Sequence, residues 1–461
     1  MKKMLFTGIF VLFVLSVKAQ SFNDTIKTKY IIDTSYSTVL SKKRKISIYL
    51  PGNYKPGDKY PVIYTLDADW MFEPTIAETK KLADFNVIPP CIVVGIYSPD
   101  RRSDMGWDLN TGEFSTSSNN FLTYLAKELV PKIQSQYTTS KLNILIGHSD
   151  GATFAQKAMI TYPEIFSGVI ALSQDLFGEQ AAGLNNYLKI QFSRQHYYYV
   201  ASGTRDATSR ITSGKIIDSI MTGNTSRLLK YKSTLYEADH SGIAAKGLGD
   251  GISFIFSDFF EPNDWNRSLI DSLINKNTDP VTFVLDYVAN INNLYDINMK
   301  PGLYGILFIG TSIANSKPKM DAFYNRFDSI LRSDGEYYSI RAQKYERLKE
   351  YDAALEYWNA HLAAKGSSTL PSFYYRRPVE LLGLKMKKTK EAVLYAEKWI
   401  SKIPGLKFPL SYTIAEICAT NGIEKKKGLI YINYFIENYA GENTYHTLDE
   451  AEKIKKRLLQ R

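Results

Sequence analysis

Seven short runs rich in β-branched and aromatic residues, separated by helical patterns, place the strongest constraint on how this chain can fold. Several of these runs are apolar on both faces and do not alternate between apolar and polar residues. A parallel sheet covered by helices on both sides buries strands in this way. We therefore predict a doubly wound α/β domain with a mostly parallel central sheet. The runs are residues 45–50, 62–66, 92–96, 144–146, 169–172, 197–200 and 234–236.

One helical pattern between these runs is especially clear. Leu125, Leu129 and Ile133 recur every four residues within residues 121–133, which gives this segment one apolar face. We expect that face to pack on the sheet.

The pattern changes after about residue 262, where strand-like runs stop and Glu261-Pro262-Asn263-Asp264 interrupts the chain. The rest of the chain has almost wholly helical patterns, with apolar stripes that recur at similar intervals. Such spacing is typical of stacked helix-turn-helix repeats, and residues 341–355 resemble one tetratricopeptide repeat. A plain helical bundle is the alternative. The stripes are Ala354, Leu355, Trp358 and Leu362, then Ala392, Ala396, Trp399 and Ile403, then Leu429, Ile432 and Ile436.

The first residues have the features of an export signal. A short basic start precedes an apolar run at residues 5–17, and Val17-Lys18-Ala19 gives the small-x-small pattern that a signal peptidase cleaves. The run is too short for a permanent membrane span, although an N-terminal anchor is the alternative. We expect a signal peptide at 1–19, an α/β domain at 20–260, a linker at 261–275 and a helical domain at 276–461. The protein is then exported, either periplasmic or secreted.

Charge and cysteine content exclude several classes of protein. The net charge of +10 falls to +7 once Lys2, Lys3 and Lys18 are removed. No basic segment with interleaved aromatic residues is present, so we expect no nucleic-acid partner. Cys91 and Cys418 lie far apart, which rules out a disulfide framework and a cysteine-based zinc site. We expect Cys91, at the start of an apolar run, to be a buried thiol.

The motif that points to chemistry is Gly147-His148-Ser149-Asp150-Gly151, between a strand pattern and a helical one. A sharp strand-to-helix turn strains the backbone of its middle residue and exposes the hydroxyl at the end of the sheet. The amide of Asp150 then lies at a helix N-terminus, where it can stabilise a developing oxyanion. We predict that Ser149 is a nucleophile.

A serine nucleophile needs a base, and the chain has five histidines. His148 lies inside the turn and is expected to point away from the reacting centre. His196 is at the start of a predicted strand, and His361 and His446 are in the helical half. His240 comes directly after the last predicted strand, at the end of the sheet that faces Ser149, and is our candidate for the base.

The third group of a triad is a carboxylate that orients the imidazole. Asp206 lies in the loop after the strand at 197–200, and the order Ser149, Asp206, His240 is the chain order of α/β-hydrolases. Asp175 is an alternative, as is a Ser-His dyad without an acid. Asp239 is too close in sequence to orient His240 easily.

Loops at the same end of the sheet supply further candidates. The backbone N–H of Ala68 or Asp69 is expected to be the second oxyanion donor. Asp67 and Asp69 could suggest a metal, but a buried or turn-capping role is the preferred interpretation. The candidates for substrate contact are Trp70, Arg101 and Trp107, with solvated loop residues as the alternative for the last two.

At these residues the chain resembles the esterase D and enterochelin esterase-like family of α/β-hydrolases. The resemblance spans about residues 35–258 and implies a serine esterase without a metal or an organic cofactor. That family cleaves siderophore, feruloyl, acetyl and formyl-thiol esters, and it also includes acyltransferases. By analogy Ser149, Asp206 and His240 take the triad positions. The features that carry the resemblance are Ile48-Tyr49-Leu50-Pro51 with Tyr54, residues 60–67, 93–96 and 121–137, the Ser149 turn, and Ala171-Leu172-Ser173.

Two departures from the family pattern concern the substrate. Asp150 stands where the family often has an apolar or small amide residue, and its carboxylate is expected to disfavour anionic substrates. The sequence Gln174-Asp175-Leu176-Phe177 replaces a bulky aromatic pair, so the acyl pocket is expected to differ.

The chain is therefore predicted to be an exported serine hydrolase that cleaves a small-molecule or glycan-linked ester through an acyl-enzyme. An acyltransferase with the same intermediate is the first alternative. A binding module, whose helical repeats recruit a protein partner, is the second. The helical half is expected to pack near the mouth of the active site or to serve as a docking surface.

Overall fold

The computed structural model describes residues 29–108, 110–259, 267–300, 306–332, 335–365, 370–441 and 446–460. The signal peptide expected at 1–19 lies outside these ranges. Within them, no helix is both long enough and apolar enough to cross a membrane.

An eight-stranded sheet forms the centre of the first half of the chain, in the order β1-β2-β4-β3-β5-β6-β7-β8. The strands β3 to β8 run parallel, whereas β1 and β2 pair antiparallel at one edge. This confirms the predicted mostly parallel α/β fold, and each predicted run lies on one of β2 to β8. The strands are β1 Ile31–Ser37, β2 Lys42–Tyr49, β3 Tyr60–Thr65, β4 Ile92–Ile96, β5 Thr139–His148, β6 Phe166–Leu172, β7 His196–Gly203 and β8 Leu229–Tyr236.

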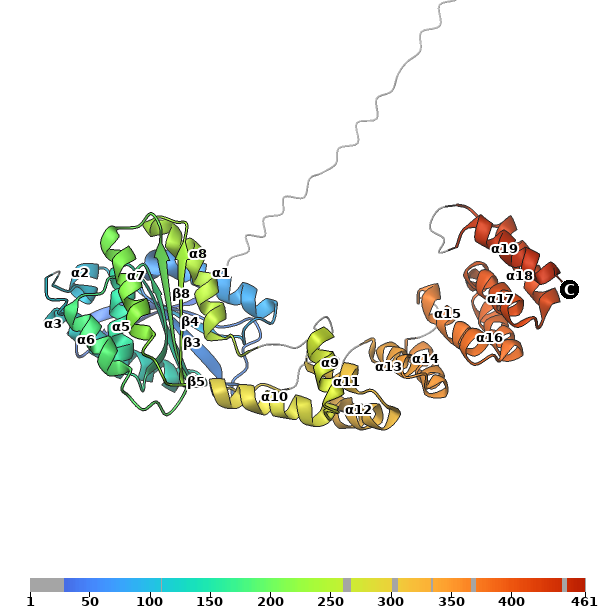
Figure 1. Cartoon of the computed structure of the whole chain (residues 1–461), viewed down its shortest axis with the longest axis horizontal. Coiled ribbons are helices and arrows are strands. Elements are labelled where there is room, and N and C mark those ends of the chain that lie inside the picture. Colours follow the sequence, from blue (N-terminus) through green and yellow to red (C-terminus); the bar gives the residue numbers. More distant parts are fainter. Residues whose placement is uncertain are drawn as a thin grey trace, which may run out of the picture.

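Helices cover both faces of the sheet, as Figure 1 shows. One apolar core lies under α1 (Ala68–Asp84), α8 (His240–Ile255) and α10 (Pro280–Tyr295). The other core lies under the helices on the opposite face, where the predicted contacts Leu125, Leu129 and Ile133 are all buried. Those helices are α3 Thr116–Tyr124, the π-helical η1 Leu125–Leu129, α4 Val130–Gln136, α5 Asp150–Thr161, α6 Gly178–Tyr187 and α7 Thr208–Met221.

The second half of the described chain is helical, as predicted, and its apolar stripes face several smaller cores. Trp358 and Leu362 are buried in these cores. The expected linker at 261–275 is helical from Arg267 onward, because Ile270 packs beside Ile309 and Ile313. The tetratricopeptide interpretation stays a prediction. The helices are α9 Arg267–Asn275, α11 Ile306–Ile313, α12 Lys317–Leu331, α13 Tyr337–Arg347, α14 Tyr351–Ala364, α15 Ser372–Glu380, η2 Leu381–Lys385, α16 Thr389–Lys402, η3 Pro404–Leu406, α17 Lys407–Asn421, α18 Lys425–Glu437 and α19 Leu448–Leu459.

Helix α10 connects the two halves of the chain (Figure 1). Its residues Ile291 and Tyr295 belong to the core beneath α1 and α8. Asp296 accepts a hydrogen bond from the amide of Lys141 near the start of β5, and it pairs with Lys59 just before β3. These contacts lie at the edge where β3 and β5 begin, and Ser149 lies just beyond the opposite end of β5. The expectation that the helical half packs at the mouth of the active site is therefore wrong for α10.

Because α10 belongs to the core of the α/β domain, the position of a truncation should decide whether that domain stays folded. A chain that ends at residue 275 exposes the apolar surface that Ile291, Tyr295 and Ile297 cover. We expect it to lose about 5 kcal/mol of stability relative to a chain that ends at residue 300. Thermal unfolding of the two chains measures this difference, and equal midpoints would contradict the assignment of α10.

Burial of His196 in β7 should make the fold sensitive to acid. Burial, together with the nearby Arg194, lowers the pKa of His196 to about 4, from 6.5 in an unfolded chain. The unfolded state therefore binds more protons between these values, so the stability present above pH 6.5 is lost as the pH falls toward 4. From about pH 7 to about pH 5 this side chain should cost about 2 kcal/mol.

A pair of variants separates this titration from packing. His196→Phe should remove the pH-dependent loss, because Phe cannot take a proton and still fits beside Phe192. Tyr187→Phe deletes the hydrogen bond between Tyr187 Oη and His196 Nδ1, 2.7 Å long, but keeps the imidazole. It should lower stability equally at both pH values. Urea unfolding at each pH provides the measurement, and an unchanged pH dependence in His196→Phe would disprove the assignment.

Candidate active site

Ser149 lies at the turn between β5 and α5, with φ 61° and ψ −125°. This is a backbone conformation that residues with a side chain rarely adopt, and it is the one expected of a nucleophile turn. The flanking glycines make the turn possible. A Cβ on Gly147 would lie 2.0 Å from the carbonyl oxygen of Gly151, so residue 147 has no room for a side chain.

Two helix N-termini meet beside Ser149. The amide of Asp150 begins α5, and the amides of Ala68 and Asp69 begin α1. Because β3 and β5 are neighbours in the sheet, the helices that come after them start side by side. None of these three amides donates a backbone hydrogen bond within the described residues. All three predicted oxyanion donors are thus at the same edge as Ser149.

His240 and Asp206 lie together at that edge. His240 is the first residue of α8, Asp206 comes just after β7, and the Nδ1–Oδ1 distance is 2.9 Å. The side chain of Asp206 is 1% exposed and that of His240 is 41% exposed. Burial alone would raise the pKa of Asp206, but hydrogen bonds from Ser173, from the Ala207 amide and from His240 hold it below the usual value.

The competing carboxylates have other roles. Asp239 caps α8 by accepting a hydrogen bond from the amide of Gly242, and Asp175 pairs with Arg210. In the described residues no hydrogen bond joins Ser149 Oγ to the ring of His240. Such catalytic bonds are often long before a substrate binds.

Ser173 is a site residue that the sequence reasoning did not assign. It lies just after β6 with φ 60°, and its Oγ donates a hydrogen bond to Asp206 Oδ2. The same Oγ lies 2.9 Å from His240 Nδ1. Since its own proton goes to Asp206, Ser173 accepts from Nδ1–H, which leaves His240 Nε2 free of its proton. Ser173 therefore favours the tautomer that a general base requires.

The expectation for His148 is wrong, because its side chain points toward the other site residues. Its Nε2 lies 2.8 Å from the carbonyl oxygen of His240, so it must donate a proton there. The two imidazole rings are 4.6 Å apart. Burial, together with weaker contributions from neighbouring groups, lowers the pKa of His148 to about 4, so the ring is neutral at ordinary pH. His148 therefore positions the backbone of the base.

Arg101 belongs to a network of charged groups at the site. Its Nε and Nη2 donate to both oxygens of Asp67 at 2.8 and 3.1 Å, and its Nη1 donates to Asp150 at 3.1 Å. Arg210 lies on the other side of Asp150, at 3.4 Å, and also pairs with Asp175 at 2.9 Å. Two guanidinium groups thus balance the negative charge of the Asp150 carboxylate. The expectation that this carboxylate repels anionic substrates therefore needs revision.

The two tryptophans have different environments. Trp107 is partly buried and packs against Phe114 and the core on the α5 side. Trp70 is 47% exposed and contacts the ring of His148 edge-to-face at 5.2 Å. Of the two tryptophans, Trp70 therefore has the ring that is open to solvent, and the substrate contacts of Arg101 and Trp107 stay predictions.

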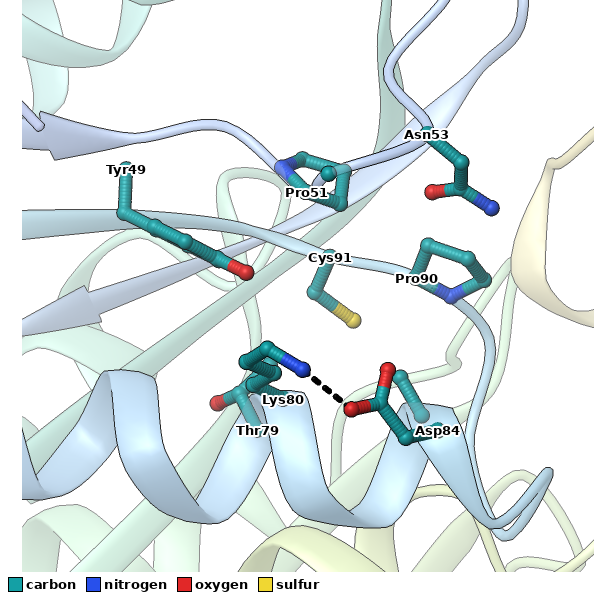
Figure 2. Close-up of a pocket in the computed structure, with 10 residues that line it drawn as sticks. Tyr49, Pro51, Asn53, Thr79, Lys80, Asp84, Pro90 and Cys91 are labelled. Carbon is teal, nitrogen blue, oxygen red and sulfur yellow. Dashed lines mark hydrogen bonds and ion pairs between the residues drawn. The ribbon is translucent and has the colours of Figure 1, made fainter. Parts of the chain in front are cut away.

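A separate hollow at the other end of α1 lacks these groups. Figure 2 shows the Cys91 thiol between the start of β4 and α1, near the Lys80–Asp84 ion pair. Cys91 is buried, as expected, and burial raises the pKa of its thiol, so it is a poor nucleophile. Among the described residues no group of three or more His, Cys, Asp or Glu side chains could hold a metal ion.

The contacts of Ser173 lead to a testable prediction. Ser173→Ala should slow ester turnover by about three- to ten-fold, because one hydrogen bond that orients His240 is lost. It should also shift the acidic limb of the pH–rate profile, which a merely structural residue would not do. Ser173→Gly is the matched control. It removes the same hydroxyl, and glycine suits the positive φ at residue 173. Its turnover should therefore match that of Ser173→Ala, while its stability should be higher than that of Ser173→Ala. Wild-type turnover and pH profile in both variants would contradict this role.

Comparisons with known proteins concern mainly the α/β domain. Residues 37–242 match the family model described as "Putative esterase". An uncharacterised Bacillus subtilis protein, YjcH, is 27% identical over 191 residues, which are 40% of this chain and 76% of that protein. A second uncharacterised Bacillus subtilis protein, YbbA, is 22% identical over 150 residues, 30% of this chain and 60% of that protein.

Solved structures share the fold. An uncharacterised protein from Capnocytophaga ochracea has a TM-score of 0.59 at 18% identity, over 77% of this chain and 99% of that chain. An IroE-like serine hydrolase from Shewanella oneidensis has a TM-score of 0.51 at 22% identity, over 69% of this chain and 99% of the other. The α/β domain is therefore similar to the putative esterase family, whose model matches residues 37–242, and it shares the α/β-hydrolase fold with these solved structures.

Proposed function

We propose that this protein hydrolyses carboxylic esters through an acyl-enzyme on Ser149. The observation that carries the proposal is the positive φ of Ser149 at a strand-to-helix turn, at the same edge as the His240–Asp206 pair. A strained turn of this kind is retained where it presents a nucleophile. The description of the Shewanella oneidensis structure as a serine hydrolase supports the same chemistry.

Each residue has one task in the proposed reaction. His240 Nε2 takes the proton from Ser149 Oγ as that oxygen bonds to the carbonyl carbon of the ester. The amides of Asp150 and of Ala68 or Asp69 stabilise the resulting oxyanion. The carbon–oxygen bond to the alcohol then breaks, and the alcohol leaves with the proton from Nε2. Water attacks the acyl-enzyme, gives its proton to Nε2 and releases the acid, and the proton returns to Ser149.

The surroundings of His240 favour water over a second alcohol as the acceptor of the acyl group. Its side chain is 41% exposed, so solvent reaches the base directly. A transferase needs to exclude water from its acyl-enzyme. Hydrolysis is therefore the simpler outcome for this site.

The proposal also places the substrate outside the cytoplasm, because the signal pattern at 1–19 predicts export. Fractionation of producing cells tests this part separately. Full-length protein that stays in the cytoplasm without cleavage near Ala19 would overturn it.

The triad is tested with p-nitrophenyl acetate. Ser149→Ala should lower turnover by about 10³-fold or more, because the covalent path is lost. A fluorophosphonate should label Ser149 of the wild type at one adduct per chain, as seen by mass spectrometry. Ser135→Ala, which removes an exposed hydroxyl on α4, is the control and should keep full activity and labelling.

The outcomes separate the proposal from its alternatives. Labelling of Ser149 without hydrolysis, with activity restored by an added alcohol, would point to an acyltransferase. Neither labelling nor turnover in a correctly folded protein would overturn the proposed chemistry and leave a binding protein.

A further inference from the structure

A hollow of about 530 Å³ lies between α1 and α8, and the proposed reaction does not use it. The side chains of α1 that line it recur along one face of that helix, and those of α8 do the same. The ring of His148 contributes to the lining between the two helices. The lining residues are Trp70, Met71, Pro74, Ala77 and Glu78 from α1, Ser241, Ala244, Ala245 and Leu248 from α8, and His148. We name this hollow the α1–α8 groove.

One end of the α1–α8 groove is lined by the sequence neighbours of the reacting groups. His148 immediately precedes the nucleophile, and Ser241 comes immediately after the base. The hydrogen bond from His148 to the carbonyl oxygen of His240 holds these two segments together. The groove is therefore adjacent to Ser149 through these two segments, which is the approach that a chain attached to an ester at Ser149 would take.

The walls of the groove suit an uncharged, apolar group. Trp70 is 47% exposed there, which is a large apolar surface left open to solvent. Ala77 and Ala245 are exposed small residues on the two facing helices, and they leave the space between them open. Pockets that bind small molecules have such mainly apolar walls with few polar groups.

Charge is confined to one lining residue. Glu78 lies two helical turns from Trp70 and pairs with Lys81 at 2.5 Å. The groove therefore extends about 12 Å along α1, the rise of eight helical residues. Arg101 and Arg210, the two cations of the charged network beside the Ser149 turn, both pair with carboxylates. The groove thus offers no free cation to an anionic substrate.

We propose that the α1–α8 groove binds an uncharged apolar chain or ring of the ester, of medium length. The chain lies between Ala77 and Ala245 with Trp70 against it, while the ester carbonyl lies at Ser149. This inference names the substrate class of the proposed esterase and rests on that function.

Filling the groove tests the proposal. Ala77→Phe and Ala245→Phe each place a ring in the space between the helices. Each should lower kcat/KM for p-nitrophenyl octanoate by about ten-fold or more, while kcat/KM for p-nitrophenyl acetate stays within about two-fold. Octyl acetate forms the second arm, with the long chain on the alcohol side. A selective loss in one arm tells which side of the ester bond occupies the groove. Ala363→Phe, at an exposed alanine of α14, is the matched control.

A binding measurement keeps this test independent of catalysis. Titration with 1-octanol should shift the tryptophan fluorescence of the wild type and of Ser149→Ala alike, because Trp70 becomes covered. The shift should be lost in Trp70→Phe and reduced in Ala245→Phe. A shift without any ester hydrolysis would support the groove and overturn the proposed function. Unchanged ratios of long-chain to short-chain turnover in both arms for all variants, or no octanol shift in Ser149→Ala, would overturn the groove.

Discussion

The close approach of Gly147 to the carbonyl oxygen of Gly151 is the contact on which the candidate site depends. Any Cβ at residue 147 would overlap that oxygen, and the turn would have to open. The turn forces Ser149 to φ 61°, which presents its hydroxyl at the edge of the sheet. It also starts α5 at once, so the amide of Asp150 is left without a helical acceptor. Nucleophile and oxyanion donor therefore come from one backbone constraint.

A network of alternating acidic and basic side chains surrounds this turn and connects the loops at this edge of the sheet. Asp67 has a positive φ of 53°, which is costly for a residue with a side chain, and Arg101 holds its carboxylate with two hydrogen bonds. Arg101 also contacts Asp150, which continues through Arg210 to Asp175. The start of α1, the nucleophile turn and the loop after β6 are thus fixed relative to one another. Asp150 serves this network, which gives a structural reason for a carboxylate beside the nucleophile.

Local patterns in the sequence were sufficient to predict the sheet, because its buried strands are continuous apolar runs. Strand β1 was missed because it is an edge strand with mostly exposed or half-exposed residues and no such run. The Ser149 turn, His240 and Asp206 could be predicted for a similar reason, since each comes directly after a predicted strand. Chain order alone then places them at one edge.

The remaining site residues depend on tertiary contacts that no local pattern encodes. Ser173 belongs to a recognised segment, yet its contact with Asp206 spans 33 residues and requires a positive φ. Arg210 lies in α7 and contacts Asp150 across 60 residues. The side chain of His148 was assigned the wrong direction, because the carbonyl that accepts its proton lies 92 residues away. Such pairs result from how the helices pack, which sequence periodicity constrains only to one face.

The same helices carry both the chemistry and the proposed selectivity. The first turn of α1 supplies candidate oxyanion amides, and the first turn of α8 supplies His240. Small residues on the inner face of α8 bring that helix close to the sheet, since a Cβ on Gly251 would lie 2.7 Å from Ile170. This packing fixes both N-termini while the outer faces, with Ala77 and Ala245, remain free to change. A larger side chain at either position alters the groove without moving the turn, so substrate preference can vary independently of the reaction.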